Sequence, residues 1–217
     1  MESPKLRLWQ RVTLALMIVG YAGYYVCRSN LSIVTPLLIK EFGSMGLNKS
    51  SLGQMVSIAT LCYAFGKFIG GSLADKLGGK KVFLFGMGGA VFCTFFFGLS
   101  GTLPLFTVAW VLNRTVQSMG WAGMVRISSR WYSYSTYGTV MGAVSLSFLF
   151  GDFAARQFLS FLVGQGLGWR SVFYSAGTVL AVIFVAALLL IKESPVDIGE
   201  EEPAASPTNL FGEEGQT

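Results

Sequence analysis

Five charged side chains lie inside long stretches that are otherwise free of charge: Arg28, Lys67, Arg114, Asp152 and Arg156. The surrounding residues are apolar enough to lie in a bilayer. A charge near the centre of a bilayer costs at least about 2.5–3.5 kcal/mol, so such a residue normally faces a partner, a cavity or a ligand. We therefore take these five as candidate functional residues.

Arg28 lies sixteen residues beyond Val12, where the first apolar stretch begins. Helical spacing places Tyr21, Tyr24 and Tyr25 on the same face as this arginine. Phenolic hydroxyls and a guanidinium would then meet in one volume. A planar guanidinium binds phosphate through two parallel hydrogen bonds, which favours a phosphate-binding site formed by these residues. The alternative is that Arg28 pairs with a carboxylate and holds helices together.

Asp152 is the one acid within the apolar stretches, and Arg156, four residues further on, is placed to pair with it on a helix. If Asp152 pairs with Arg156, it is less available to Arg28, which argues against the alternative that Arg28 only pairs with a carboxylate. Lys67 shares a helix face with Tyr63 and is a second candidate phosphate ligand. It also lies close enough to a predicted helix end for its ammonium to reach the membrane surface, and the sequence leaves both readings open.

Arg114 shares a helix face with Gln117 and Trp121. If the fourth and fifth apolar segments are neighbours, Arg114, Asp152 and Arg156 form a three-charge cluster. Arg114, Gln117, Trp121, Asp152 and Arg156 could line a cavity, act as a coupling element, or simply join helices.

The composition excludes several classes of protein. The chain has 217 residues, of which 53% are hydrophobic and 12% charged, and its mean hydropathy is +0.58. Soluble domains carry about twice that fraction of charge. There is no histidine and there are three cysteines, so we expect no metal site, no cofactor and no enzyme. The basic residues are separated by apolar runs, which argues against a nucleic-acid surface.

The elements that must position these residues are membrane-spanning helices. A span needs about 20 apolar residues, and Gly98, Gly101 and Pro104 divide one long apolar run into two spans. We predict an all-α membrane protein, a bundle of six transmembrane helices within residues 1–195. The expected spans are 12–39, 50–74, 82–100, 104–126, 137–163 and 171–191.

The distribution of charge predicts the topology of this multi-pass chain. Nine basic residues flank the spans on the side of the N-terminus and three lie on the other side, which places the N-terminus in the cytoplasm. Six spans return the C-terminus to the cytoplasm. Residues 192–217 hold seven acids and one lysine. We expect residues 196–217 to be a disordered acidic tail or a linker.

The loop between the second and third spans reads Gly71-Ser-Leu-Ala-Asp75-Lys-Leu-Gly78-Gly-Lys80-Lys81. An acid and basic residues in a glycine-turned loop at this place resemble the cytoplasmic signature of the major facilitator superfamily. The resemblance implies that the loop takes part in conformational change.

The first span reads Gly20-Tyr-Ala-Gly-Tyr-Tyr-Val-Cys-Arg28-Ser-Asn-Leu. It resembles the first helix of the organophosphate:phosphate antiporters, a group that includes the glycerol-3-phosphate and hexose-phosphate transporters. The segment from Gln117 to Trp121 extends the similarity. The resemblance implies that Arg28 binds phosphate, that Lys67 lies near the central cavity, and that the protein exchanges a sugar phosphate or glycerol phosphate for inorganic phosphate by alternating access.

Members of that family have twelve spans in two halves, so this chain corresponds to the N-terminal six-span half in a plasma or inner membrane. A second six-helix half, on the same polypeptide or another chain, is the expected partner. Arg114, Asp152 and Arg156 depart from the family's usual small residues or proline. A membrane receptor that senses external sugar phosphate is the main alternative function, and a half that is inert on its own is another.

Overall fold

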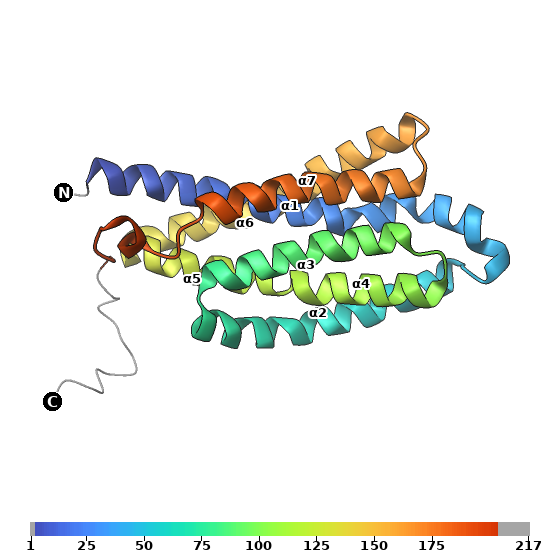
Figure 1. Cartoon of the computed structure of the whole chain (residues 1–217), viewed down its shortest axis with the longest axis horizontal. Coiled ribbons are helices and arrows are strands. Elements are labelled where there is room, and N and C mark those ends of the chain that lie inside the picture. Colours follow the sequence, from blue (N-terminus) through green and yellow to red (C-terminus); the bar gives the residue numbers. More distant parts are fainter. Residues whose placement is uncertain (1–2, 204–217) are drawn as a thin grey trace.

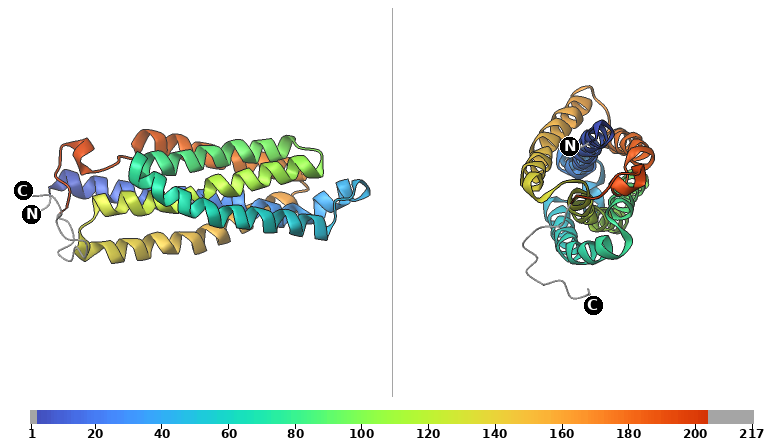
Figure 2. Two further views of the ribbon diagram at one scale, coloured as in Figure 1. Left: turned by 90° about the horizontal axis from the view of Figure 1, so that it is seen from below. Right: turned by 90° about the vertical axis from the view of Figure 1, so that its left-hand side faces the viewer.

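The computed structural model describes residues 3–203, and these residues form helices and no strand (Figure 1). The α-helices run roughly parallel to one long axis (Figure 2). The elements are α1 (Pro4–Phe42), η1 (Gly43–Met45), α2 (Lys49–Leu77), α3 (Gly79–Leu99), α4 (Leu103–Gln117), α5 (Met119–Trp131), α6 (Tyr134–Gly164), α7 (Trp169–Leu190) and η2 (Pro195–Ile198). The predicted all-α bundle is confirmed.

The predicted fourth span, residues 104–126, is divided between α4 and α5. At Ser118 the backbone N–H is shared between the carbonyl oxygens of Arg114 and Thr115, each at 3.2 Å. The Ser118 hydroxyl also donates to the Thr115 carbonyl oxygen at 2.6 Å. A serine side chain that competes for backbone carbonyls disturbs a helix locally. Because Ser118 keeps helical dihedral angles, α4 and α5 together pass once along the length of the bundle. The described residues therefore pass along the bundle six times.

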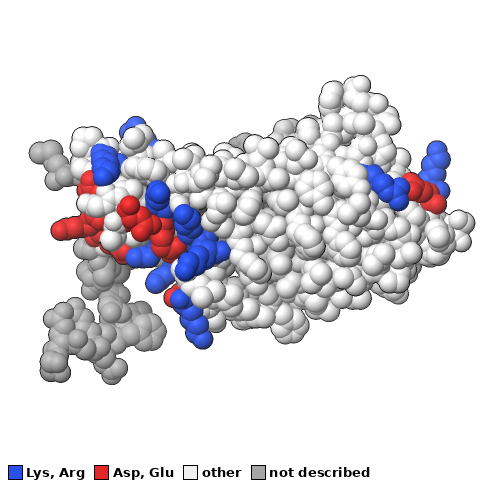
Figure 3. Space-filling view, in the orientation of Figure 1, with Lys and Arg blue, Asp and Glu red and all other residues white. Residues whose placement is uncertain are grey.

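Five helical segments within residues 3–203 are long and apolar enough to cross a membrane, and α4 and α5 are each shorter than these. The space-filling view shows charged residues gathered at the two ends, with an uncharged belt between them (Figure 3). Many large apolar side chains are exposed, including Phe65, Phe68 and Phe150. Lipid is the natural solvent for such a surface. With α4 and α5 taken together, the observed helices all begin before the predicted spans, and α3 and α7 each end one residue earlier than predicted.

The helix α1 packs along α6 and α7, while α3 packs against α4, α5 and α7. The helix α2 covers α4 and α5. A buried aromatic cluster joins several of these helices near the end away from the termini, and the rings of Phe97 and Phe173 stack with their centroids 4.2 Å apart. This packing fixes α1 and α4, which carry the candidate site, relative to each other.

Residues 196–203 are the first part of the segment expected to be a disordered acidic tail or a linker, and the structure gives them defined contacts with the helices. Residues 195–198 form η2, and the segment contacts the start of α1 and the end of α5. Lys5 Nζ donates to the Ile198 carbonyl oxygen, and Arg130 Nε donates to Glu202 at 3.0 Å. The Glu202 carboxylate raises the pKa of Arg130. Acidic residues of this segment are bound by the basic residues at the ends of the helices, as Glu202 is by Arg130. The rest of the expected tail, residues 204–217, lies outside the described residues.

The closest approach of α3 to α5 depends on two glycines, Gly79 and Gly123. A Cβ atom on Gly123 would lie 2.7 Å from the Phe83 backbone nitrogen and 2.8 Å from the Gly79 carbonyl oxygen. Backbone atoms cannot move aside as a flexible side chain can, so α3 and α5 would have to separate. Small residues permit such contacts in membrane bundles.

We expect Gly123→Ala to destabilise the bundle by about 1–3 kcal/mol because it overpacks this contact. Thermal unfolding in detergent, followed by loss of the monodisperse species, measures the effect. Gly142→Ala on α6 is the matched control, since a Cβ there meets nothing within 4 Å. Equal melting temperatures for the two variants would contradict the assigned contact.

Candidate anion-binding site

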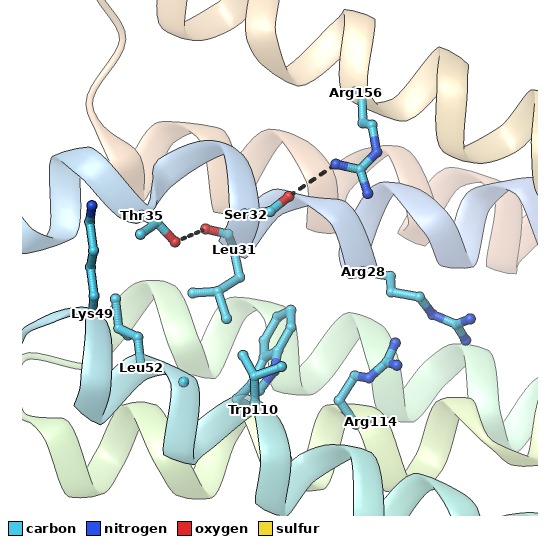
Figure 4. A pocket seen from close by; sticks show the side chains of 11 residues that line it. Arg28, Leu31, Ser32, Thr35, Lys49, Leu52, Trp110, Arg114 and Arg156 are labelled. Carbon is cyan, nitrogen blue, oxygen red and sulfur yellow. Dashed lines mark hydrogen bonds between the residues drawn. The ribbon is translucent and has the colours of Figure 1, made fainter.

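A cavity of about 430 Å³ lies between α1, α2, α4 and α6. It extends from Arg28 and Arg114 towards Lys49 at the start of α2 (Figure 4). Cavities of this size hold small organic ligands. Its lining residues are Arg28, Leu31, Ser32, Thr35, Lys49, Leu52, Gly53, Val56, Trp110, Arg114 and Arg156.

The Arg28 guanidinium is held by aromatic rings and one amide. Its Nε donates to Gln117 Oε1 at 3.1 Å. Its central carbon lies 4.6 Å from the centre of the Tyr25 ring and 5.1 Å from that of Tyr63. Its Nη2 is buried without a hydrogen-bond partner, and Arg28 forms no ion pair with the residues described. The positive charge is therefore positioned but not neutralised.

A chain of hydrogen bonds fixes the orientation of Gln117. Asn113 Nδ2 donates to Thr94 Oγ1 at 3.0 Å and to the Ala90 carbonyl oxygen at 3.2 Å. The Asn113 oxygen is therefore the acceptor for Gln117 Nε2. This leaves the Gln117 oxygen facing Arg28. A line of neutral amides thus stabilises the guanidinium and adds no negative charge.

Arg114 lies close to Arg28. Its guanidinium carbon is 4.8 Å from the centre of the Tyr63 ring, and its Nη1 is buried without a partner. Trp110 Nε1 is likewise buried and unpartnered. Lys67 Nζ lies 5.1 Å from the same Tyr63 ring, but Lys67 is exposed and does not line the cavity. The ring of Tyr63 is thus a shared contact of three cations.

The predicted tyrosine face is only partly realised. Tyr25 lies against Arg28, and Tyr21 packs with Tyr25 and Trp121 at centroid distances of 5.7 Å in each case. Tyr24 is fully buried and donates its hydroxyl proton to the Phe83 carbonyl oxygen at 2.7 Å. The structure therefore places Tyr24 in the core between α1 and α3 and not among the residues that line the cavity, and its contact with substrate stays a prediction.

The predicted cluster of Arg114, Asp152 and Arg156 is not formed. Arg156 Nε donates to Asp152 Oδ2 at 2.8 Å, and Ser29 Oγ donates to Asp152 Oδ1 at 2.5 Å. The reason is topological: α6 packs along α1, so Asp152 meets Ser29, whereas Arg114 meets Tyr63. Arg156 reaches the cavity rim and donates to Ser32 Oγ at 3.4 Å.

The loop motif lies at the end of the bundle that holds both the start of α1 and η2. Gly78 adopts φ +93°, which glycine tolerates and which ends α2 directly before α3. Gly78, Lys80, Lys81 and Asp75 line a shallow pocket with Arg126 and Arg130. Gly71 lies within α2, four residues before Asp75. No ion pair of Asp75 occurs within residues 3–203.

Glu193 is a residue of this end that the sequence reasoning missed. Its carboxylate accepts from the backbone N–H of Gly79 at 2.8 Å and of Lys80 at 2.7 Å, at the N-terminus of α3. Arg130 Nη1 lies 3.6 Å away. A helix N-terminus favours a carboxylate. The sequence could have indicated this contact, because Glu193 is an acid that follows the last predicted span closely and lies on the same side of the membrane as the basic loop.

The chain belongs to the major facilitator superfamily, since the family model described as Major Facilitator Superfamily matches residues 17–213. The resemblance found in the sequence is confirmed at this level, and the protein is a membrane transporter-family protein, not an enzyme. The relatives below agree with the organophosphate:phosphate antiporter group.

The chain is similar to a "Probable hexose phosphate transport protein" of Chlamydia trachomatis, with 27% identity over 89% of the chain and 41% of the relative. It is also similar to a "Glycerol-3-phosphate transporter" of Bacillus subtilis, with 25% identity over 92% of the chain and 45% of the relative. A third relative is the "Membrane sensor protein UhpC" of Escherichia coli, 24% identical over 89% and 43%. The chain therefore spans less than half the length of these relatives.

Solved transporters share the fold. The chain aligns with a bacterial homologue of the human lysosomal transporter Spinster at a TM-score of 0.75 and 18% identity, covering 97% of this chain and 47% of that one. The inward-open xylose transporter XylE of E. coli gives a TM-score of 0.74 and 14% identity, covering 86% and 49%. The six-helix bundle thus corresponds to about half of a major facilitator fold.

We expect Glu193→Gln to destabilise the protein by about 1–3 kcal/mol, because two backbone donors at the start of α3 lose their ionised acceptor. Thermal unfolding in detergent measures the loss. Glu201→Gln, which changes an exposed neighbour, is the control. If both variants melt together with the unaltered protein, Glu193 does not stabilise α3 through this contact.

Proposed function

We propose that this chain is the N-terminal half of a secondary transporter that exchanges a sugar phosphate or glycerol phosphate for inorganic phosphate. The observation that carries the proposal is the unneutralised guanidinium of Arg28 at a cavity in the middle of the bundle. A buried cation without a counterion is unfavourable. A phosphoryl group supplies the missing charge and accepts two parallel hydrogen bonds from a guanidinium.

The rest of the cavity suits the organic part of such a ligand. Leu31, Leu52 and Val56 give it an apolar wall, and Ser32 and Thr35 add hydroxyl groups. Small-molecule sites commonly combine an apolar lining with a few polar groups that fix orientation. Tyr21, Tyr25 and Trp121 form the support next to Arg28. Lys67 is proposed to approach the phosphate from the side of Tyr63 during the transport cycle.

The relatives support the substrate class, because two of them are named as carriers of hexose phosphate and glycerol 3-phosphate. We propose that a second six-helix half closes the site, either on the same polypeptide or on another chain. In such proteins substrate binds near the membrane midplane between two halves that rock against each other.

The other charged residues are assigned to coupling and conformational change. The Asp152–Arg156 pair joins α6 to α1 beside the cavity, so it is placed to sense substrate at Arg28. The Asp75 loop is proposed to contact the second half in one state of the cycle. Both ends of the six-helix unit are proposed to lie in the cytoplasm, which the excess of basic residues on that side supports, and the membrane is proposed to be a plasma or inner membrane.

A sensor is the second candidate function, because a relative is named a membrane sensor protein. The same anion site would serve either role. Binding of a sugar phosphate without measurable exchange would favour the sensor.

We expect Arg28→Gln to lower phosphate exchange at least about tenfold, since a charge-assisted pair of hydrogen bonds is lost. Uptake of labelled phosphate is measured in proteoliposomes that carry the chain with its second half and are loaded with unlabelled glycerol 3-phosphate or glucose 6-phosphate. Arg11→Gln, in the same helix but exposed near its start, is the matched control.

Exchange at the normal rate by Arg28→Gln would refute the assigned site. No exchange by the unaltered protein, together with tight binding of glucose 6-phosphate, would replace the transporter by the sensor.

A further inference from the structure

We propose that Arg114 is a second phosphate ligand, so that Arg28 and Arg114 clamp one phosphoryl dianion from within this six-helix half. This inference rests on the proposed function and deepens it. It assigns the second guanidinium of the site to α4 of this chain, independently of what a second half contributes.

The two arginines converge on one place although they belong to different helices. Their guanidinium carbons lie 5.1 and 4.8 Å from the centre of the same Tyr63 ring. Both side chains line the same cavity. In the close view their guanidinium groups extend towards a common region at one end of that cavity (Figure 4). A single small ligand at this end can contact both.

The contrast with other arginines is informative. Arg130, Arg156 and Arg170 are partly exposed, and each has a carboxylate oxygen within 3.0 Å. Arg7, Arg11 and Arg126 have no ion pair within residues 3–203, but they are exposed. Arg28 and Arg114 have no such partner in the described chain, and each has a buried nitrogen that forms no hydrogen bond. The protein thus leaves two neighbouring charges unneutralised where neutralisation would be worth most.

The neighbouring groups are also selective for an anion. Gln117 offers Arg28 a neutral oxygen, and Trp110 brings an unpartnered N–H donor to the cavity lining. Asp152, which lines a second cavity with Arg28, is committed to Arg156 and Ser29. Two guanidinium groups with no acid between them match a ligand of charge −2, the state of a phosphate monoester above its second pKa of about 6.

Binding of inorganic phosphate to the 217-residue chain in nanodiscs, measured by calorimetry at pH 7.5, tests the inference. We expect measurable binding to the unaltered chain and a loss of at least about tenfold in affinity for both Arg28→Gln and Arg114→Gln, since each removes charge-assisted hydrogen bonds. Arg170→Gln is the matched control and should bind within about threefold of the unaltered chain, because its charge is already paired with Glu41 and it does not line the cavity.

The outcomes separate this inference from the proposed function. If Arg28→Gln loses binding and Arg114→Gln keeps it, the clamp is refuted and the phosphate site at Arg28 stands. If both variants bind normally, both proposals fail. If the unaltered chain binds no phosphate while exchange with a second half is normal, the clamp is not completed within this half and the inference is overturned.

Folding of the variants is checked by thermal unfolding without phosphate. Arg114→Gln removes one of two like charges, so its melting temperature should equal or exceed that of the unaltered chain. Arg114→Lys provides a second test, because lysine keeps the charge and lacks the planar fork. We expect it to bind phosphate with an affinity between those of Arg114→Gln and the unaltered chain, and affinity equal to that of Arg114→Gln would contradict a charge-based role.

Discussion

The candidate site depends on a guanidinium that lies inside a membrane bundle and forms no ion pair with the residues described, because the nearby Asp152 is paired with Arg156. Arg28 is stabilised by the faces of Tyr25 and Tyr63 and by the oxygen of Gln117. Each of these contacts attracts a cation, and none of them neutralises it. The free-energy cost of the charge that stays without a counterion makes binding of an anionic ligand favourable at this position. This cost links the packing of the bundle to the proposed transport of phosphate esters.

Several features of the fold are needed for this arrangement. The approach of α2 to the junction of α4 and α5 brings Tyr63 into contact with both Arg28 and Arg114. A chain of amides and a hydroxyl from α3 to α4 sets the orientation of Gln117. The carboxylate of Asp152 on α6 forms an ion pair with Arg156. These contacts present Arg28 and Arg114 to the cavity and keep the carboxylate of α6 in an ion pair.

The membrane bundle could be predicted from the sequence because charges in apolar stretches and helical periodicity are local properties, and the family could be predicted from the resemblance of short motifs. The binding role of Arg28 stays a prediction. The sequence did not predict that Tyr24 turns to the core or that Arg114 joins Arg28 instead of Asp152. Those outcomes depend on which helices are neighbours: Tyr24 meets Phe83 of α3, and α6 packs on α1, so that Asp152 meets Ser29. The ordered segment after α7 was missed for a related reason: Glu193 and Glu202 find basic partners only after the helix ends are assembled.

The most direct test is to locate the anion. Tungstate is a heavy tetrahedral dianion that can replace phosphate, and its position can be found by anomalous scattering from crystals of the protein. The account predicts one strong site within hydrogen-bonding distance of Arg28 and Arg114, on the cavity side of Tyr63. Tungstate bound at Lys49 or at the Lys80–Lys81 loop, with the Arg28 site empty, would contradict it.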